Sequence, residues 1–215
     1  MDTTQIIDFF ARWMHLLFGI TWIGLLYYFN FIQGAYFKAA GPEALADAKA
    51  KLAPKALWWF RWGAMFTFLT GLVLLGKLGH DKNIDYFIVV GATLGTLMFL
   101  NVWLIIWPNQ KIALGIKEGD GPAAGAKALL ASRTNTLFSG PMAYGMLASS
   151  HGFGGGANLL SNSGPSLGLW VALGIIALLQ INAIVGKQGP MTSVVGVIHC
   201  SIGLTIVLMG ILHFV

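Results

Sequence analysis

The sequence predicts an all-α, polytopic membrane helix bundle, and three observations lead to that fold class. Hydrophobic residues make up 56% of the 215 residues and charged residues only 10%, and the mean hydropathy is +0.73. A soluble domain carries roughly a quarter of charged residues, so this chain cannot cover its own surface with polar groups. Long apolar segments also recur along the chain, and a bilayer-crossing helix needs about 20 such residues. We therefore expect a single integral membrane domain over residues 1–215, in contact with membrane lipid.

Six apolar segments are predicted to cross the membrane. The fourth is the weakest, because it is short and interrupted by Gly140 and Pro141. Between the first two segments, GPEALADAKAKLAPK predicts a short polar helix that rests on the membrane surface. The Gly/Ser/Asn-rich stretch SHGFGGGANLLSNSGPS predicts an irregular exposed loop. The six predicted spans lie at about residues 5–33, 57–79, 84–107, 134–150, 166–186 and 190–214.

The distribution of basic residues predicts the orientation of these spans. Cytoplasmic loops of membrane proteins are enriched in Lys and Arg, and the basic residues here divide ten against three between the two sides. We therefore expect a bacterial inner-membrane protein with both termini outside the cytoplasm, and no nucleic-acid partner despite the net charge of +5. The amino terminus lacks the basic region of a signal peptide, so the first span is expected to be retained. The predicted cytoplasmic side holds Lys38, Lys49, Lys51, Lys55, Arg61, Lys111, Lys117, Lys127, Arg133 and Lys187, and the other side Arg12, Lys77 and Lys82.

The first span carries its polar residues on one helical face. Steps of three and four residues place a histidine on this face, and ionisable residues at membrane depth indicate a functional site. We expect His15 to be an axial ligand of a haem iron, with Gly19 making room for the macrocycle and Trp22 beside it. The alternative is a histidine hydrogen-bonded to a neighbouring helix, with an interfacial Asp8–Arg12 ion pair. The face consists of Asp8, Arg12, His15, Gly19, Trp22 and Leu26.

The last span repeats the same stepping with two histidines. His199 and His213 are fourteen residues apart, which is about 21 Å along a helix axis. Helices of b-type cytochromes use similar spacing to hold two haems. The alternative is a packing groove of small residues with incidental histidines. This second face consists of Gly196, His199, Gly203, Ile206, Gly210 and His213.

The predicted depths of the histidines limit their pairing as ligands. We favour His15 with His213 or His151 for an outer haem b. His199 lies deeper, so it would hold a second haem with a partner not visible in the sequence, or pair with His15 if the helices are strongly tilted. His80 lies in the charged turn GHDKN and is expected to be solvated. The only cysteine, Cys200, excludes disulfides within the chain and a c-type haem attachment.

Three amide side chains also lie at membrane depth. We expect Asn101, Gln180 and Asn182 to make hydrogen bonds between helices rather than substrate contacts. Arg133 opens the fourth predicted span, where it would pair with a haem propionate or a lipid phosphate, or simply anchor the helix.

Four stretches resemble, in the same order, the membrane-embedded amino-terminal domain of the bacterial cytochrome-linked urate oxidase (urate hydroxylase) family. They are RWMHLLFGITWIGLLYYFNF, WWFRWGAMFTFLTGLVLL, GATLGTLMFLNVWLIIWPNQK and SRTNTLFSGPMAYGMLASSHG. The resemblance covers about residues 5–151, with a weaker echo at INAIVGKQG. In that family a c-type cytochrome domain follows the membrane domain, so this sequence resembles a short form without it. The resemblance includes His15 and His151.

The sequence leaves three functions open. The first is a b-type haem protein that transfers electrons with other membrane subunits or a cytochrome c, since two imidazole ligands suit electron transfer. The second is a membrane oxidoreductase that acts on urate or a related purine and reduces an external cytochrome c. The third is a structural or assembly subunit without redox chemistry. We expect one haem b, or two, in the first case.

Overall fold

The computed structural model describes residues 3–151, 158–160 and 165–215, and its regular elements are helices. One isolated bridge joins Asp85 to Asn158. The α-helices are α1 (Thr3–Tyr27), α2 (Gly34–Ala39), α3 (Pro42–Asp47), α4 (Ala53–His80), α5 (Tyr86–Leu100), α6 (Trp107–Ala113), α7 (Gly121–Ser150), α8 (Leu167–Val185) and α9 (Val194–Phe214). Three π-helical segments, η1 (Tyr28–Gln33), η2 (Ala48–Leu52) and η3 (Asn101–Ile106), and the 3₁₀ turn η4 (Gly189–Thr192) complete the set.

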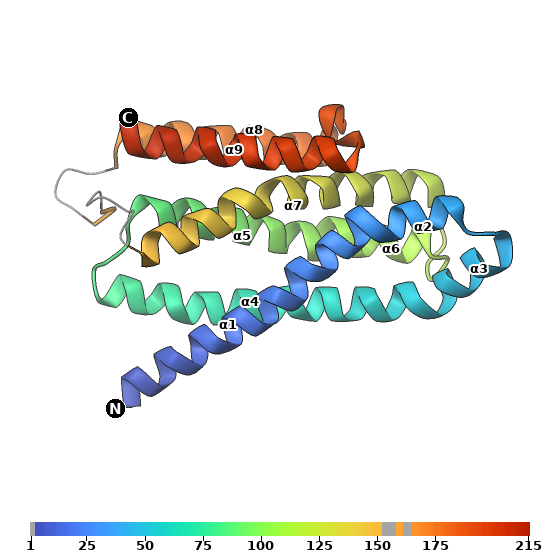
Figure 1. The fold of residues 1–215 in the computed structure, drawn as a ribbon. Coiled ribbons are helices and arrows are strands. Elements are labelled where there is room, and N and C mark those ends of the chain that lie inside the picture. The colour runs from blue at the N-terminus through green and yellow to red at the C-terminus, as the bar shows by residue number, and fades with distance from the viewer. Residues whose placement is uncertain (1–2, 152–157, 161–164) are drawn as a thin grey trace.

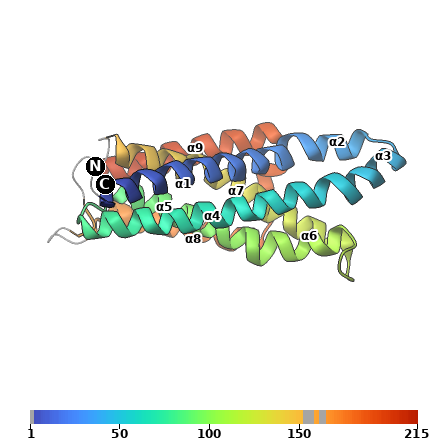
Figure 2. The same cartoon turned by 90° about the horizontal axis from the view of Figure 1, so that it is seen from below.

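The all-α membrane fold predicted from the composition is confirmed. Within the described residues, five continuous helical rods are long and apolar enough to cross a membrane. Figure 1 shows the helices running roughly along one axis, with both termini at the same end of the bundle. Figure 2 places the two termini at that end as well. The rods are Thr3–Ala39, Pro42–His80, Tyr86–Ala113, Leu167–Val185 and Val194–Phe214.

Helix α7 replaces the short fourth span predicted at about 134–150. It has 30 residues, a length of about 45 Å, and it begins thirteen residues earlier than predicted. It contacts α5, α6, α8 and α9, and every residue from Ala131 to Ser139 is buried. Figure 1 shows α9 on one side of α7 and α5 on the other. Because protein covers α7, its polar residues do not face lipid, which is why its sequence is less apolar than that of the other helices.

The segment predicted as a short polar helix between the first two spans is helical, but it continues into the second span. Helices α3 and α4 are joined through η2 into one rod, Pro42–His80. Pro54 lies in the first turn of α4, where its fixed φ is helical, and the π-helical η2 precedes it. Proline removes one amide donor without ending a helix when the neighbouring geometry adjusts.

This rod and the rod Thr3–Ala39 form a hairpin longer than the membrane is thick. The rods have 37 and 39 residues, or roughly 55–59 Å each, against about 30 Å of hydrocarbon. Figures 1 and 2 show α2 and α3 extending beyond α6 at the end of the bundle opposite the termini. We call this end the hairpin end.

Helices α5 and α7 approach until their backbones touch. A β-carbon at Gly145 would lie 2.6 Å from the carbonyl oxygen of Phe87, and one at Gly91 would lie 3.2 Å from the carbonyl oxygen of Met142. These two glycines remove the side chains that would otherwise separate the helices, as in small-residue contacts between membrane helices. The buried core of the bundle forms around this contact, with Val90, Leu94 and Met98 fully enclosed.

Candidate functional site

The ring of His15 lies against α4 with a defined orientation. Its Nδ1 is 3.1 Å from Oγ1 of Thr70. The single hydroxyl proton of Thr70 is directed to backbone oxygens, 2.7 Å to Phe66 and 3.0 Å to Thr67. In the tautomer that carries its hydrogen on Nδ1, His15 donates to Thr70. In a neutral imidazole this leaves the lone pair on Nε2, which has no hydrogen-bond partner among the described residues.

A glycine on α4 provides the space for this ring. A β-carbon at Gly71 would lie 3.1 Å from Cε1 of His15, so any larger residue would displace the imidazole. The predicted companions of His15 pack on α4 as well. Gly19 faces Thr67 at ordinary contact distance, and Trp22 is 2% exposed against the backbone of Gly63. The polar face predicted for the first span is thus the contact surface with α4.

The alternative proposed for the first span is also present in the structure. The side-chain nitrogen Nε of Arg12 lies 2.8 Å from Oδ2 of Asp8. His15 is hydrogen-bonded to a neighbouring helix through Thr70. Such contacts leave Nε2 of His15 as the one ring nitrogen that a ligand could occupy.

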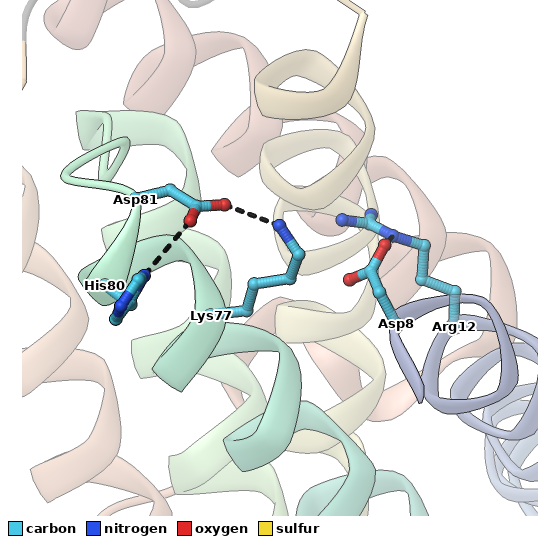
Figure 3. A network of polar contacts seen from close by, with 5 residues as sticks. All are labelled: Asp8, Arg12, Lys77, His80 and Asp81. Atoms are coloured by element: carbon cyan, nitrogen blue, oxygen red, sulfur yellow. Dashed lines mark hydrogen bonds and ion pairs between the residues drawn. The ribbon is translucent and has the colours of Figure 1, made fainter. Parts of the chain in front are cut away.

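A second group of charged residues lies beside the Asp8–Arg12 pair at the end of the bundle that holds the termini (Figure 3). Nζ of Lys77 lies 2.5 Å from Oδ2 of Asp81, and Nδ1 of His80 lies 3.4 Å from Oδ1 of the same carboxylate. The hydrogen bond from Lys77, followed by that from His80, lowers the pKa of Asp81 below its ordinary value. The expected solvated position of His80 is confirmed by its 89% exposed side chain.

The histidines of α9 lie on the outer surface of the bundle. His199 and His213 are both exposed. Nδ1 of His199 is 2.8 Å from the carbonyl oxygen of Val195 one turn earlier in the same helix, and the ring of His213 contacts that of Phe214 edge to face. The glycines between them open onto empty space, since a β-carbon at Gly203 or Gly210 would meet no atom within 4 Å. The described chain therefore does not use this face as a packing groove.

His151 ends α7 and is also exposed, with Nδ1 3.0 Å from the carbonyl oxygen of Leu147. Figure 1 shows the amino-terminal half of α1 and helix α9 on opposite sides of the bundle. The structure thus separates His15 from His199 and His213 within one chain. In the described residues, no group of three or more His, Cys, Asp or Glu side chains is arranged to hold a metal ion.

The predicted hydrogen bonds between helices are confirmed for two of the three amides. Nδ2 of Asn101 donates to Oε1 of Gln180 at 3.0 Å, and Nε2 of Gln180 donates back to Oδ1 of Asn101 at 2.6 Å. Asn101 also donates to Oδ1 of Asn135 at 2.8 Å, and Asn135 donates to the carbonyl oxygen of Met98. Asn182 instead binds backbone atoms of Lys187 just beyond its own helix.

Sequence reasoning missed Asn135 as a member of this cluster, which we call the amide cluster (Asn101, Asn135 and Gln180). Asn135 lies within SRTNT, where five consecutive polar residues resemble the exposed start of a span. All five are buried. The run of five polar residues could have predicted their burial, because polar residues inside a membrane bundle require partners on neighbouring helices.

Two arginines are buried without a carboxylate partner. Arg61 and Arg133 are each 8% exposed. Nη1 of Arg133 donates to the carbonyl oxygen of Ser193 at 3.5 Å, and the guanidinium of Arg61 lies 3.4 Å above the centre of the Trp107 ring. The sequence placed Arg61 only among the basic residues that predict the orientation of the spans, so its burial was not predicted.

These features define the class of protein as a polytopic, all-α membrane protein with buried polar side chains between its helices. Residues 82–161, from the turn before α5 to the segment after α7, match the family model described as Urate oxidase N-terminal. This match supports the urate oxidase N-terminal-like family, in agreement with the resemblance found in the sequence. No curated protein and no solved structure matches the chain.

Proposed function

We propose that this chain binds haem b through Nε2 of His15 and transfers electrons as a subunit or partner of a larger membrane redox complex. One observation carries the proposal: Nδ1 of His15 is tied to Thr70 while Nε2 is left without a protein partner. Histidines that bind metals commonly donate their other ring nitrogen to an oxygen acceptor, which fixes the tautomer and the ring orientation. His15 and Thr70 have this arrangement.

The residues around His15 fit a ligand of this kind. Thr70 accepts from Nδ1 in the tautomer that leaves Nε2 free for a ligand, and Gly71 leaves room for the ring. Phe18, one turn after His15 on the same side of α1, packs against Phe66 of α4 and offers an apolar ring to a flat macrocycle. Haem b, when bound, supplies a one-electron carrier whose potential depends on its axial ligands and on burial.

A second axial ligand would come from another copy of the chain or another subunit. His151, His199 and His213 are the remaining candidates, and all three lie on the surface. Surface histidines on apolar helices are available to a neighbouring subunit in the membrane. This supports a role inside a complex, with other membrane subunits or a cytochrome c as partners.

An ultraviolet-visible spectrum of the protein purified in mild detergent tests this proposal. We expect a Soret band and a reduced α band of the b type in the wild type, and their loss in His15→Ala. His80→Ala is the matched control, since His80 is an exposed histidine on α4 bonded only to Asp81. Its spectrum should equal that of the wild type. A wild-type protein without a Soret band, after expression with added haem, would instead favour the structural or assembly role.

A second candidate function is oxidation of urate or a related purine with an external cytochrome c as electron acceptor. The match of residues 82–161 to the Urate oxidase N-terminal family model favours it. The test measures reduction of added cytochrome c by membranes that contain the chain, with and without urate. Urate-dependent reduction that is absent from membranes without the chain would support this function, and equal rates in the two kinds of membrane would exclude it under these conditions.

We further propose that the hairpin end lies in the cytoplasm of a bacterium and that both termini lie outside it. The ten-to-three division of Lys and Arg supports this orientation, because cytoplasmic loops are enriched in these residues. Labelling of a single cysteine introduced at Lys117, with Cys200 replaced by Ser, tests it in intact cells. A membrane-impermeant maleimide should fail to label this position until the cells are opened.

A further inference from the structure

Two cations share one tryptophan ring near the hairpin end. Cζ of Arg61 lies 3.4 Å from the centre of the Trp107 ring, and Nζ of Lys111 lies 5.4 Å from the same centre. Both distances are within the range of cation–π attraction. The two charges are therefore separated by no more than the sum of these distances, about 9 Å, which is close to the Debye length at physiological ionic strength.

Among the residues that the structure describes, no ion pair balances these two charges. The ion pairs of the described residues join Arg12 to Asp8, Lys51 to Asp47, and Lys77 and His80 to Asp81, so none includes Arg61 or Lys111. Arg61 is 8% exposed, and its Nη1 is buried without a hydrogen-bond partner. A buried charge is expensive unless an opposite charge and hydrogen bonds compensate it. The site lacks one component, and that component is an anion.

The surroundings indicate which anion fits. Trp58 and Trp59, within one turn of Arg61, are 47% and 60% exposed, and Trp62 contacts Trp103 edge to face. Tryptophans gather in this way at the level of lipid headgroups. Lys55 lies six residues before Arg61, about 9 Å along the helix, toward the basic hairpin. An anion bound here has apolar surface on one side and lysines on the other.

We propose that Arg61 and Lys111 bind the phosphate of an anionic phospholipid at the hairpin end, with Trp107 holding both cations in place. The forked guanidinium of Arg61 matches phosphate oxygens. The exposed rings of Trp58 and Trp59 provide contact for the acyl chains. Free phosphate would satisfy the same cations but would make no use of these rings.

Native mass spectrometry tests the site on the whole chain. The protein is transferred to micelles that contain equal amounts of phosphatidylglycerol and phosphatidylcholine, and the retained lipids are counted. We expect retention of one phosphatidylglycerol in preference to phosphatidylcholine. Lys111→Gln should lower this preference about five-fold, since a basic residue near anionic lipid contributes about 1 kcal/mol. Lys111 is only partly buried, so this variant keeps the fold.

Lys127→Gln is the matched control, because Lys127 is an exposed lysine at the same end of the bundle that contacts no tryptophan ring. It should leave the lipid preference unchanged. Arg61→Lys keeps the charge but loses the fork, and should also weaken the preference. Equal preference in the wild type, Lys111→Gln and Arg61→Lys would overturn the proposal. A third arm adds inorganic phosphate in excess. Displacement of the lipid by phosphate would identify free phosphate as the ligand and overturn the lipid assignment.

Discussion

His15 on α1 and Thr70 on α4 are joined by a hydrogen bond of 3.1 Å between Nδ1 of the imidazole and the threonine hydroxyl. The two residues are 55 positions apart in the chain. Their contact is possible because Gly71, next to Thr70, leaves space for the imidazole. A positioning residue of this kind acts through the histidine and makes no contact of its own with a bound iron.

On the proposal that Nε2 of His15 binds haem, Thr70→Val should weaken haem retention about 10- to 100-fold while leaving the helices folded, because loss of the partner of a metal-binding histidine has effects of this size. The measurement is the amount of haem that survives dialysis, read from the Soret band. Thr96→Val is the control, since the Thr96 hydroxyl bonds only to the carbonyl oxygen of Ala92 in its own helix. Equal haem retention in both variants would show that Thr70 does not position His15.

Gly145→Ala should destabilise the bundle by about 1–3 kcal/mol, the range for overpacking a close contact. The added β-carbon would lie 2.6 Å from the carbonyl oxygen of Phe87 and 3.2 Å from the amide nitrogen of Gly91. Thermal unfolding in detergent, followed by circular dichroism, measures the effect. Gly203→Ala on α9 is the control because its β-carbon would meet open space; it should unfold at or above the wild-type temperature.

Asn101→Ala should cost about 1–3 kcal/mol of stability, because the amides of Gln180 and Asn135 would lose a buried partner. Asn101 is fully buried, so water does not readily replace the lost bonds. Asn109→Ala provides the comparison, since Asn109 bonds only to the carbonyl oxygen of Ile105. Unfolding in urea or sodium dodecyl sulfate measures both. Equal midpoints for the two variants would contradict the role of the amide cluster in joining α7 and α8 to η3.

Acid should weaken the Lys77–Asp81 interaction. The folded-state pKa of Asp81 is lowered by its hydrogen bonds from Lys77 and His80, so this contribution to stability is complete above the ordinary Asp value of about 3.9. It is lost as the pH falls further, through the folded-state pKa. Unfolding temperatures of the wild type and Asp81→Asn should therefore differ at pH 6 and converge toward pH 3. A constant difference between them at both pH values would count against this interaction.

The fold class could be predicted because lipid imposes a simple requirement on composition. All five rods are apolar over a length that crosses a membrane. This pattern is visible in the sequence without knowing which helices pack against one another. Helix α7 was harder to delimit. Its polar residues, such as Asn135 and Thr136, are enclosed by other helices, and the sequence alone does not show which helix lies at the centre.

The candidate site was predictable only in part for a related reason. The stepping of Asp8, His15, Trp22 and Leu26 identified the face that contacts another helix, and the structure places that face on α4. Which residue would receive Nδ1 of His15 depends on the register between α1 and α4, so Thr70 and Gly71 were not foreseen. The burial of Arg61 depends likewise on Trp107, 46 residues further along the chain.

The length of the hairpin rods has a practical consequence. Because the rods are longer than the hydrocarbon is thick, we expect the turn between Ala39 and Pro42 to stand clear of the bilayer. Lys49 and Lys51, a few residues further on, are exposed. Trypsin added to sealed vesicles can reach these lysines from one side of the membrane only. Small antibody fragments that bind the same projection would add ordered mass outside the membrane. Such mass helps to align particles of a small membrane protein in electron cryomicroscopy.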